Sequence, residues 1–114
     1  MSLIHEAPVF QVVYDLLKRI HLLRKRFEKS EKYSLGSTLE ESSLETLLAI
    51  VEAGRQKQEW KIGSIDRALM SLEKLQILVR LAHDLKQIPE RAYIDLQTSI
   101  QQAGRMLGGW RKKA

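Results

Sequence analysis

The residues of this chain best suited to chemistry are basic side chains in its first third. Lys18, Arg19, Arg24, Lys25 and Arg26 fall in one short stretch. On a helix, the two lysines lie two turns apart and opposite the apolar seam, with the arginines beside them. Such a strip of cations can follow the phosphates of a nucleic acid. The same pattern is also typical of a solvated helix face whose long basic side chains cover apolar surface, so the spacing leaves both interpretations open.

Catalytic and metal-binding patterns are scarce. The chain has no cysteine, which excludes disulfides, thiolate ligands and cysteine nucleophiles. His5, His21 and His83 are scattered, and no Glu-x-x-His motif of a di-metal bundle occurs. Walker, nucleophile-elbow and dinucleotide-binding motifs are also missing. We therefore predict a non-enzymatic protein without metal or cofactor; the alternative is an enzyme that uses a carboxylate site of unrecognised spacing.

Length and composition indicate one soluble domain. The chain has 114 residues, 44% of them hydrophobic, and we expect a single domain over residues 1–114. Its net charge of +5 favours polyanionic partners, and only residues 34–59 are acidic overall. No apolar run approaches the ~20 residues of a membrane span, and no export signal precedes the first helix. A cytoplasmic protein that does not contact the membrane is the expected result.

Apolar spacing predicts the first two helices. A heptad-like seam indicates a helix over about residues 8–29, and its members are Val9, Val13, Leu16, Ile20, Leu23 and Phe27. A second helix is expected over about 37–57, because Ser37 and Glu40 have the spacing of a capping box. Its predicted buried residues are Leu44, Leu47, Leu48 and Val51.

A third and a fourth helix complete the predicted fold. The third covers about 60–87, with the apolar residues Ile62, Ile65, Leu69, Leu72, Leu75, Val79 and Ala82. Leu78, Leu81 and Leu85 widen its apolar stripe, which indicates a central position or a contact with another subunit. Pro89 begins the fourth helix, over about 89–111. Four helices with short links predict an all-α, antiparallel, up-down-up-down bundle.

The last predicted helix contains three glycines that each cost about 1 kcal/mol relative to alanine. The apolar pattern nevertheless continues past Gly104, Gly108 and Gly109 to Trp110, so we expect the helix to continue as well. Close packing against a helix of the same bundle or of an adjacent subunit would offset the cost. Gly104, Gly108 and Trp110 are therefore the predicted interface residues, and Arg105 should project outward.

Two segments carry a resemblance to a known family. Residues 27–39, FEKSEKYSLGSTL, resemble the first interhelical link of small bacterial four-helix-bundle proteins. That group includes proteins encoded in intervening sequences of 23S ribosomal RNA genes and the accessory variability determinants of diversity-generating retroelements. The ending GRMLGGW, residues 104–110, is similar to the Gly-Arg-aliphatic-Leu-Gly-small-Trp ending of the second branch.

The resemblance implies a non-enzymatic partner of a retroelement reverse transcriptase that supports mutagenic retrohoming. It also implies a homopentameric barrel with a positive surface that binds RNA or RNA/DNA. Under that expectation, the first-helix cations and Arg105 are candidate contacts to nucleic acid or polymerase. The alternative from the other branch is a structural module of the ribosomal intervening-sequence type that binds a protein through the apolar edge of the third helix.

Overall fold

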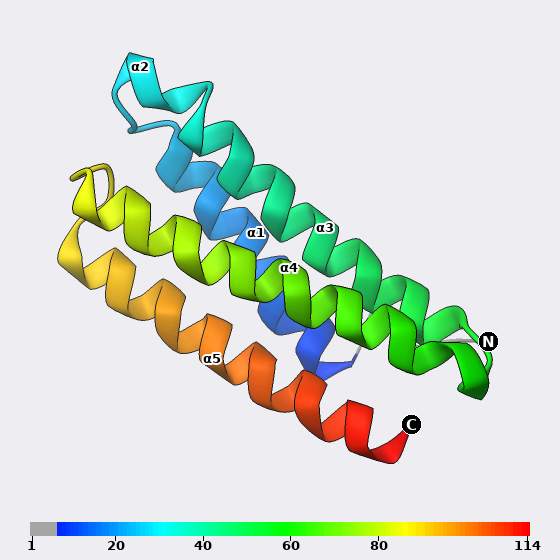
Figure 1. Cartoon of the computed structure of the whole chain (residues 1–114). Coiled ribbons are helices and arrows are strands. Elements are labelled where there is room, and N and C mark those ends of the chain that lie inside the picture. The colour runs from blue at the N-terminus through cyan, green and yellow to red at the C-terminus, as the bar shows by residue number, and fades with distance from the viewer. Residues whose placement is uncertain (1–6) are drawn as a thin grey trace.

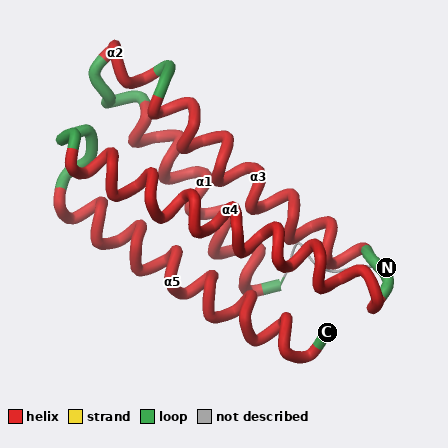
Figure 2. Tube along the Cα trace, viewed as in Figure 1, coloured by secondary structure: helices red, strands yellow, loops and turns green. Residues whose placement is uncertain are grey.

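The computed structural model describes residues 7–114, which form four long helices and one short helix, without a strand in that range. The helices are α1 (Pro8–Arg24), α2 (Lys29–Lys32), α3 (Leu35–Arg55), α4 (Gln58–Asp84) and α5 (Glu90–Lys113). The long helices run antiparallel, and each packs beside the next in the order α1, α3, α4, α5, with α5 also against α1 (Figures 1 and 2). The predicted all-helical bundle is confirmed. No helix within residues 7–114 is long and apolar enough to span a membrane.

The link after the first helix differs from the prediction. The first helix ends at Arg24 rather than near residue 29, and α2 adds one helical turn inside the expected link. The capping box predicted at Ser37 is wrong, because α3 already begins at Leu35. The Ser37 hydroxyl instead donates to the Glu41 carboxylate at 3.2 Å, one turn further along the helix.

The predicted seams of the first and third long helices are largely confirmed. Five of the six seam positions in and after α1 are buried, and Leu23 is partly buried. On α4 the buried members of the predicted set are Ile65, Leu72, Leu75, Val79 and Ala82. Ile62, Leu81 and Leu85 are exposed instead. The apolar stripe of α4 is therefore wider than the part of it that packs into the core of this chain.

The predicted buried face of α3 is wrong. Leu44 and Leu48 are 43% and 56% exposed, whereas Ser42, Ser43 and Thr46 are fully buried. Of the four apolar residues predicted to be buried, only Leu47 is, and Val51 is partly exposed.

The buried hydroxyl groups of α3 all have hydrogen-bond acceptors. Ser43 and Thr46 donate to carbonyls of their own helix, each at 2.9 Å. Ser42 donates across the interface to the Ser71 carbonyl of α4 at 3.4 Å. Burying these hydroxyls therefore leaves no donor unsatisfied. The small volume of Ser42 lets the backbone of α3 lie close to that of α4, and Leu44 and Leu48 remain outside.

The final helix passes through its glycines, as predicted. α5 continues to Lys113 without a break. A Cβ at Gly104 would lie 3.7 Å from Leu72 Cδ2 of α4, an ordinary van der Waals distance. At Gly108 and Gly109 a Cβ would meet nothing within 4 Å. Packing inside one chain therefore does not require the last two glycines.

The loops at one end of the bundle are joined by Gln87. Its side-chain oxygen accepts from the Glu28 backbone N–H at 2.8 Å, and its amide nitrogen donates to the Glu28 carboxylate at 2.8 Å. Lys86 just before it has φ 60°, which ends α4 in a Schellman turn. The Gln87 N–H reaches the Ala82 carbonyl at 2.9 Å. These bonds join the link between α1 and α2 to the loop between α4 and α5.

Candidate nucleic-acid interface

The basic residues of the first helix point in different directions, and Arg24 lies between α1 and α3. Its Nε donates to the Lys32 carbonyl at 2.8 Å, and its guanidinium lies 5.7 Å from the Tyr33 ring centroid. The stem crosses Gly36 so closely that a Cβ there would be 2.7 Å from Arg24 Cγ. A guanidinium nitrogen also lies 3.5 Å from Glu40. Arg24 therefore holds the α1–α3 link in place and offers little free charge.

Arg19 lies on the other side of α1 and contacts α5. Its guanidinium donates to Ser99 Oγ at 2.7 Å, and its Nε is 2.9 Å from the Asp15 carboxylate one turn earlier. The side chain is about one-third exposed. Arg19 therefore joins two helices and still presents part of its positive charge to solvent.

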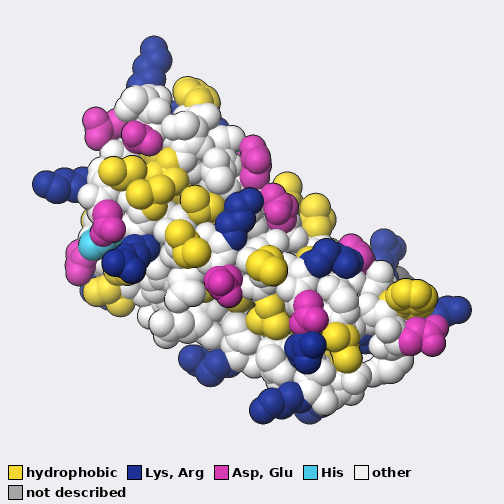
Figure 3. Space-filling model, in the orientation of Figure 1, with side chains coloured by type: hydrophobic (Ala, Val, Ile, Leu, Met, Phe, Trp, Pro, Cys, Tyr) yellow, Lys and Arg dark blue, Asp and Glu magenta, His cyan; other side chains and the backbone are white. Residues whose placement is uncertain are grey.

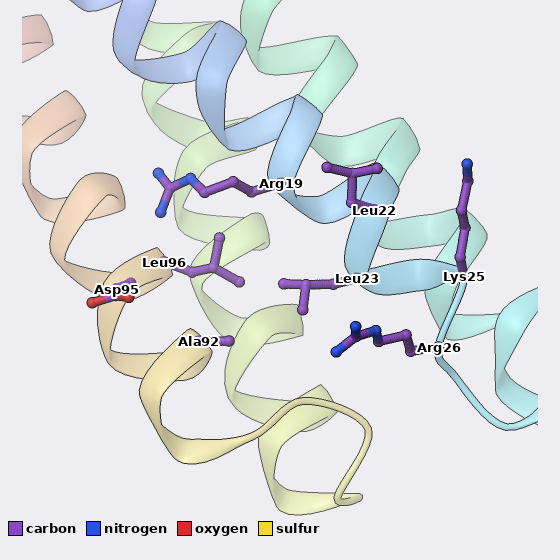
Figure 4. A pocket seen from close by; sticks show the side chains of 8 residues that line it. All are labelled: Arg19, Leu22, Leu23, Lys25, Arg26, Ala92, Asp95 and Leu96. Carbon is purple, nitrogen blue, oxygen red and sulfur yellow. The ribbon is translucent and has the colours of Figure 1, made fainter.

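Lys25 and Arg26 follow the last turn of α1 and are fully available to a ligand. Both are exposed, and neither forms an ion pair within residues 7–114. Arg26 reaches toward α5 across a groove of about 530 Å³, whereas Lys25 extends away from α5 (Figure 4). The groove is lined by Arg19, Leu22, Leu23, Lys25, Arg26, Ala92, Asp95 and Leu96. Its single acid, Asp95, lies 3.6 Å from Arg91 Nε.

Arg105 lies toward the other end of the same side of the bundle. It is exposed, without an ion pair in the described chain, and it lines a groove between the start of α1 and the end of α5. Lys113 lines that groove too, because α5 extends further than the expected end near residue 111. We call Arg19, Lys25, Arg26, Arg105 and Lys113 the α1/α5 basic face. Sequence spacing could not assemble this set, since it joins the two ends of the chain.

Two predicted residues lie apart from this face. Lys18 lines the groove between α1 and α3, and its Nζ lies 5.8 Å from the Tyr14 ring centroid. Trp110 is partly buried against the core of its own chain, with Lys61 Nζ 6.0 Å from its ring centroid. The chain therefore already gives Trp110 a packing role.

An ion pair that the sequence did not suggest joins α5 to α4. Arg111 donates to both carboxylate oxygens of Asp66, at 2.6 and 3.2 Å. The hydrogen bond from Arg111 is the main cause that lowers the pKa of Asp66. The same bond raises the pKa of Arg111. Because 45 residues separate the partners, no local pattern points to the pair.

His21 and His83 each lie beside a glutamate of the next long helix along the chain. His21 Nδ1 lies 2.9 Å from Glu40, and His83 Nε2 lies 2.5 Å from Glu90. His83 also stacks on Tyr93 with 4.1 Å between ring centroids. In residues 7–114, no three histidine or carboxylate side chains come together as metal ligands would. His5 lies outside the described residues.

The described part of the chain is a small helical bundle with basic side chains toward both ends of its α1/α5 side and several exposed apolar residues. A family model described as bAvd-like matches residues 9–114. The chain therefore belongs to this family of bacterial accessory variability determinants. At family level it is an accessory protein of diversity-generating retroelements, which confirms the resemblance drawn from GRMLGGW. No curated protein matches the sequence.

Proposed function

We propose that this chain is the nucleic-acid-binding accessory subunit of a diversity-generating retroelement. It assembles into a homo-oligomer, a pentamer by family resemblance, that holds template RNA and the reverse transcriptase together during mutagenic retrohoming. The observation that carries the proposal is the α1/α5 basic face. Lys25, Arg26 and Arg105 have no acidic partner within residues 7–114, so their charge is free for phosphates.

The side chains favour recognition of backbone charge over recognition of bases. Aromatic platforms on which bases could stack are missing from the grooves of the basic face apart from the partly buried Trp110. Tyr33 is well exposed but belongs to the α1–α3 link, where it faces Arg24. Each subunit alone would make few phosphate contacts. Repeating the face in an oligomer converts weak contacts into avidity, since one RNA strand can engage several subunits.

Binding to a labelled single-stranded RNA, measured by fluorescence anisotropy at several salt concentrations, tests the proposal. The test variant is Lys25→Glu with Arg26→Glu; Arg24 stays unchanged because it holds the fold. We expect the affinity to fall by roughly tenfold or more and the salt dependence to become shallower by about one unit per lost phosphate contact.

The matched control is Arg55→Glu with Lys74→Glu, which makes the same charge change at exposed positions on α3 and α4. The affinity of this control for RNA should stay within about twofold of the wild-type value. Its substitutions change the net charge of the protein but remove no proposed phosphate contact. Equal losses of affinity in the two variants would show that binding depends only on the net charge of the protein. Unchanged binding in the test variant would overturn the proposed face.

A further inference from the structure

Trp60 is an aromatic side chain that the bundle leaves without a stacking partner. It lies in the first turn of α4 and is 62% exposed. The other aromatic rings of the chain are buried, stacked on a neighbouring ring or faced by a cation. They are Phe10 and Tyr14, which stack on each other, Phe27 in the core, Tyr33 facing Arg24, Tyr93 stacked on His83, and Trp110 beside Lys61. Trp60 is therefore the one exposed ring within residues 7–114 that no other ring or cation faces.

The space beside Trp60 is open because the neighbouring residue on its side of α4 is a glycine. Gly63 lies one turn further along, and a side chain at this position would point back toward the turn that carries Trp60. A Cβ at Gly63 would meet nothing nearer than Arg67 Nη1, at 4.0 Å. The Arg67 guanidinium is already paired with Glu52 of α3. A flat group therefore has room to lie against the indole ring.

Two lysines and one glutamate flank Trp60 along the chain. Lys57 is exposed and forms no ion pair in the part of the chain that the structure describes. Lys61 is partly buried, and Glu59 is the one acid next to the ring. Figure 3 shows apolar, basic and acidic side chains mixed at the end of the molecule where α4 begins. The free positive charge of Lys57 is available to a phosphate near the ring.

This end of the bundle is continuous with the α1/α5 basic face. Helix α4 begins at the same end of the bundle at which α5 ends (Figure 1). Lys61 Nζ lies 6.0 Å from the Trp110 ring centroid. Trp110 in turn lines the groove that contains Arg105 and Lys113. A strand that leaves this groove over the end of α5 can therefore reach Trp60 by way of Lys61.

We propose that Trp60 stacks on a base of single-stranded RNA and that Lys57 contacts a phosphate beside that base. The contact rests on the RNA binding in the proposed function and adds a base-stacking site outside the α1/α5 basic face. It accepts any base, because every base has a π-face. A tryptophan that anchors a protein partner lies within a packed apolar area, whereas Gly63 and Arg67 are the neighbours of Trp60 on its side of α4. These surroundings favour a base as the occupant.

Tryptophan fluorescence tests the contact directly. In a Trp110→Phe background, Trp60 is the one tryptophan of the chain, so the emission reports on this site alone. We expect a single-stranded oligouridylate to quench the emission as it binds. An RNA duplex of the same length should bind through its phosphates without quenching, because its bases are already stacked on one another. Equal quenching by the two RNAs, or no quenching by the bound single strand, would overturn the stacking contact.

Substitution of Trp60 measures what the ring contributes to affinity. Trp60→Ala should weaken binding of the single-stranded oligouridylate, measured by fluorescence anisotropy, by about 5-fold to 100-fold. Trp60→Phe should recover part of the loss, and binding of the duplex should stay within about twofold. The matched control is Leu81→Ala, at an exposed apolar position on the same helix that lines none of the grooves described above. Its affinity for both RNAs should also stay within about twofold of the wild-type value.

The outcomes distinguish this site from the proposed function. If Trp60→Ala binds the single strand as tightly as the wild-type protein does, the stacking contact is overturned and RNA binding by the α1/α5 basic face stands. If the wild-type protein binds neither RNA, the proposed function itself fails. Light scattering on Trp60→Ala should give the wild-type molar mass. A lower mass would assign Trp60 to a contact between protein chains and would overturn its role in RNA binding.

Discussion

Neighbouring helices α1 and α3 differ in what they add to an apolar buried face. The buried residues of α1 are all apolar, whereas α3 buries Ser42, Ser43 and Thr46 beside its apolar residues and leaves Leu44 outside. The first helix is held by removal of apolar surface from water. The second combines burial of apolar residues such as Ile50 with close approach to α4, where the small side chain of Ser42 reaches the Ser71 carbonyl. Leu44 and Leu48, the apolar residues of α3 that this contact does not cover, are therefore exposed to solvent.

The largest expected effect is the difference in unfolding free energy between a leucine substitution on α1 and one on α3. Leu16→Ala on α1 should lower the free energy of unfolding by about 2–5 kcal/mol, since Leu16 is fully buried. Leu48→Ala on α3 should change it by less than about 0.5 kcal/mol when measured on dilute, monomeric protein. Urea titrations provide both values. Similar losses for the two variants would remove the distinction between the helices.

The seam between α3 and α4 should not tolerate enlargement. Ser42→Leu places a large side chain against the Ser71 backbone, and we expect a loss of about 1–3 kcal/mol from overpacking. The reverse change two residues further along, on the outer side of the helix, Leu44→Ser, should leave the unfolding free energy of the monomer almost unchanged. Urea denaturation checks the pair. A stabilising Ser42→Leu would show that the seam has spare volume.

The α1–α3 link offers a coupled test of Arg24. Gly36→Ala should destabilise the protein by roughly 1 kcal/mol, because the added methyl group meets Arg24 Cγ. In an Arg24→Ala background the same change should stabilise instead, since alanine favours a helix more than glycine does. A double-mutant cycle measures the coupling. Additive effects would mean that Arg24 does not occupy the space beside Gly36.

A substitution of Lys86, at the end of α4, should have a smaller effect on stability and of the opposite sign. Its φ of 60° lies in the left-handed region, which glycine adopts without steric strain. Lys86→Gly should therefore stabilise the chain by about 0.5–1 kcal/mol in thermal or urea unfolding. Lys74→Gly in the middle of the same helix is the matched control and should destabilise by about 1 kcal/mol. A destabilising Lys86→Gly would contradict the turn described here.

The smallest effect concerns the exposed Asp66–Arg111 pair. Arg111 lowers the pKa of Asp66, so the unfolded chain takes up a proton there at higher pH than the folded chain does. The stabilisation is therefore present above the ordinary carboxyl pKa and is lost as pH falls through the folded value. Arg111→Gln should raise the pKa of Asp66 in an NMR titration. An unchanged value would show that the pair does not persist in solution.

Sequence patterns specified α1 better than α3 for a physical reason. In α1 every apolar seam position falls on one side, so hydropathy and packing agree. In α3, Leu44 and Leu48 lie on the exposed side, and Leu39, Ile50 and the small hydroxyl residues lie on the buried side. Hydropathy alone predicted burial of the side that carries Leu44 and Leu48. Hydropathy treats serine and threonine as polar and takes no account of the nearby carbonyls to which their buried hydroxyls donate.

Only some residues of the candidate binding site could be predicted from the sequence. Lys25, Arg26 and Arg105 are free cations, as their sequence positions indicated. The structural engagement of Arg24 was not visible, because it depends on Gly36 and Tyr33 in a link with no regular periodicity. The grouping of α1 with α5 also requires the tertiary fold. Whether these cations contact RNA remains the prediction that the anisotropy experiment tests.

The molar mass of the wild-type chain in solution, measured by light scattering over a range of concentrations, tests whether the chain assembles with copies of itself. If the chain self-assembles as proposed, the mass is a fixed multiple of the 13.2 kDa chain, five for the proposed pentamer. A mass of one chain at every concentration would contradict the account.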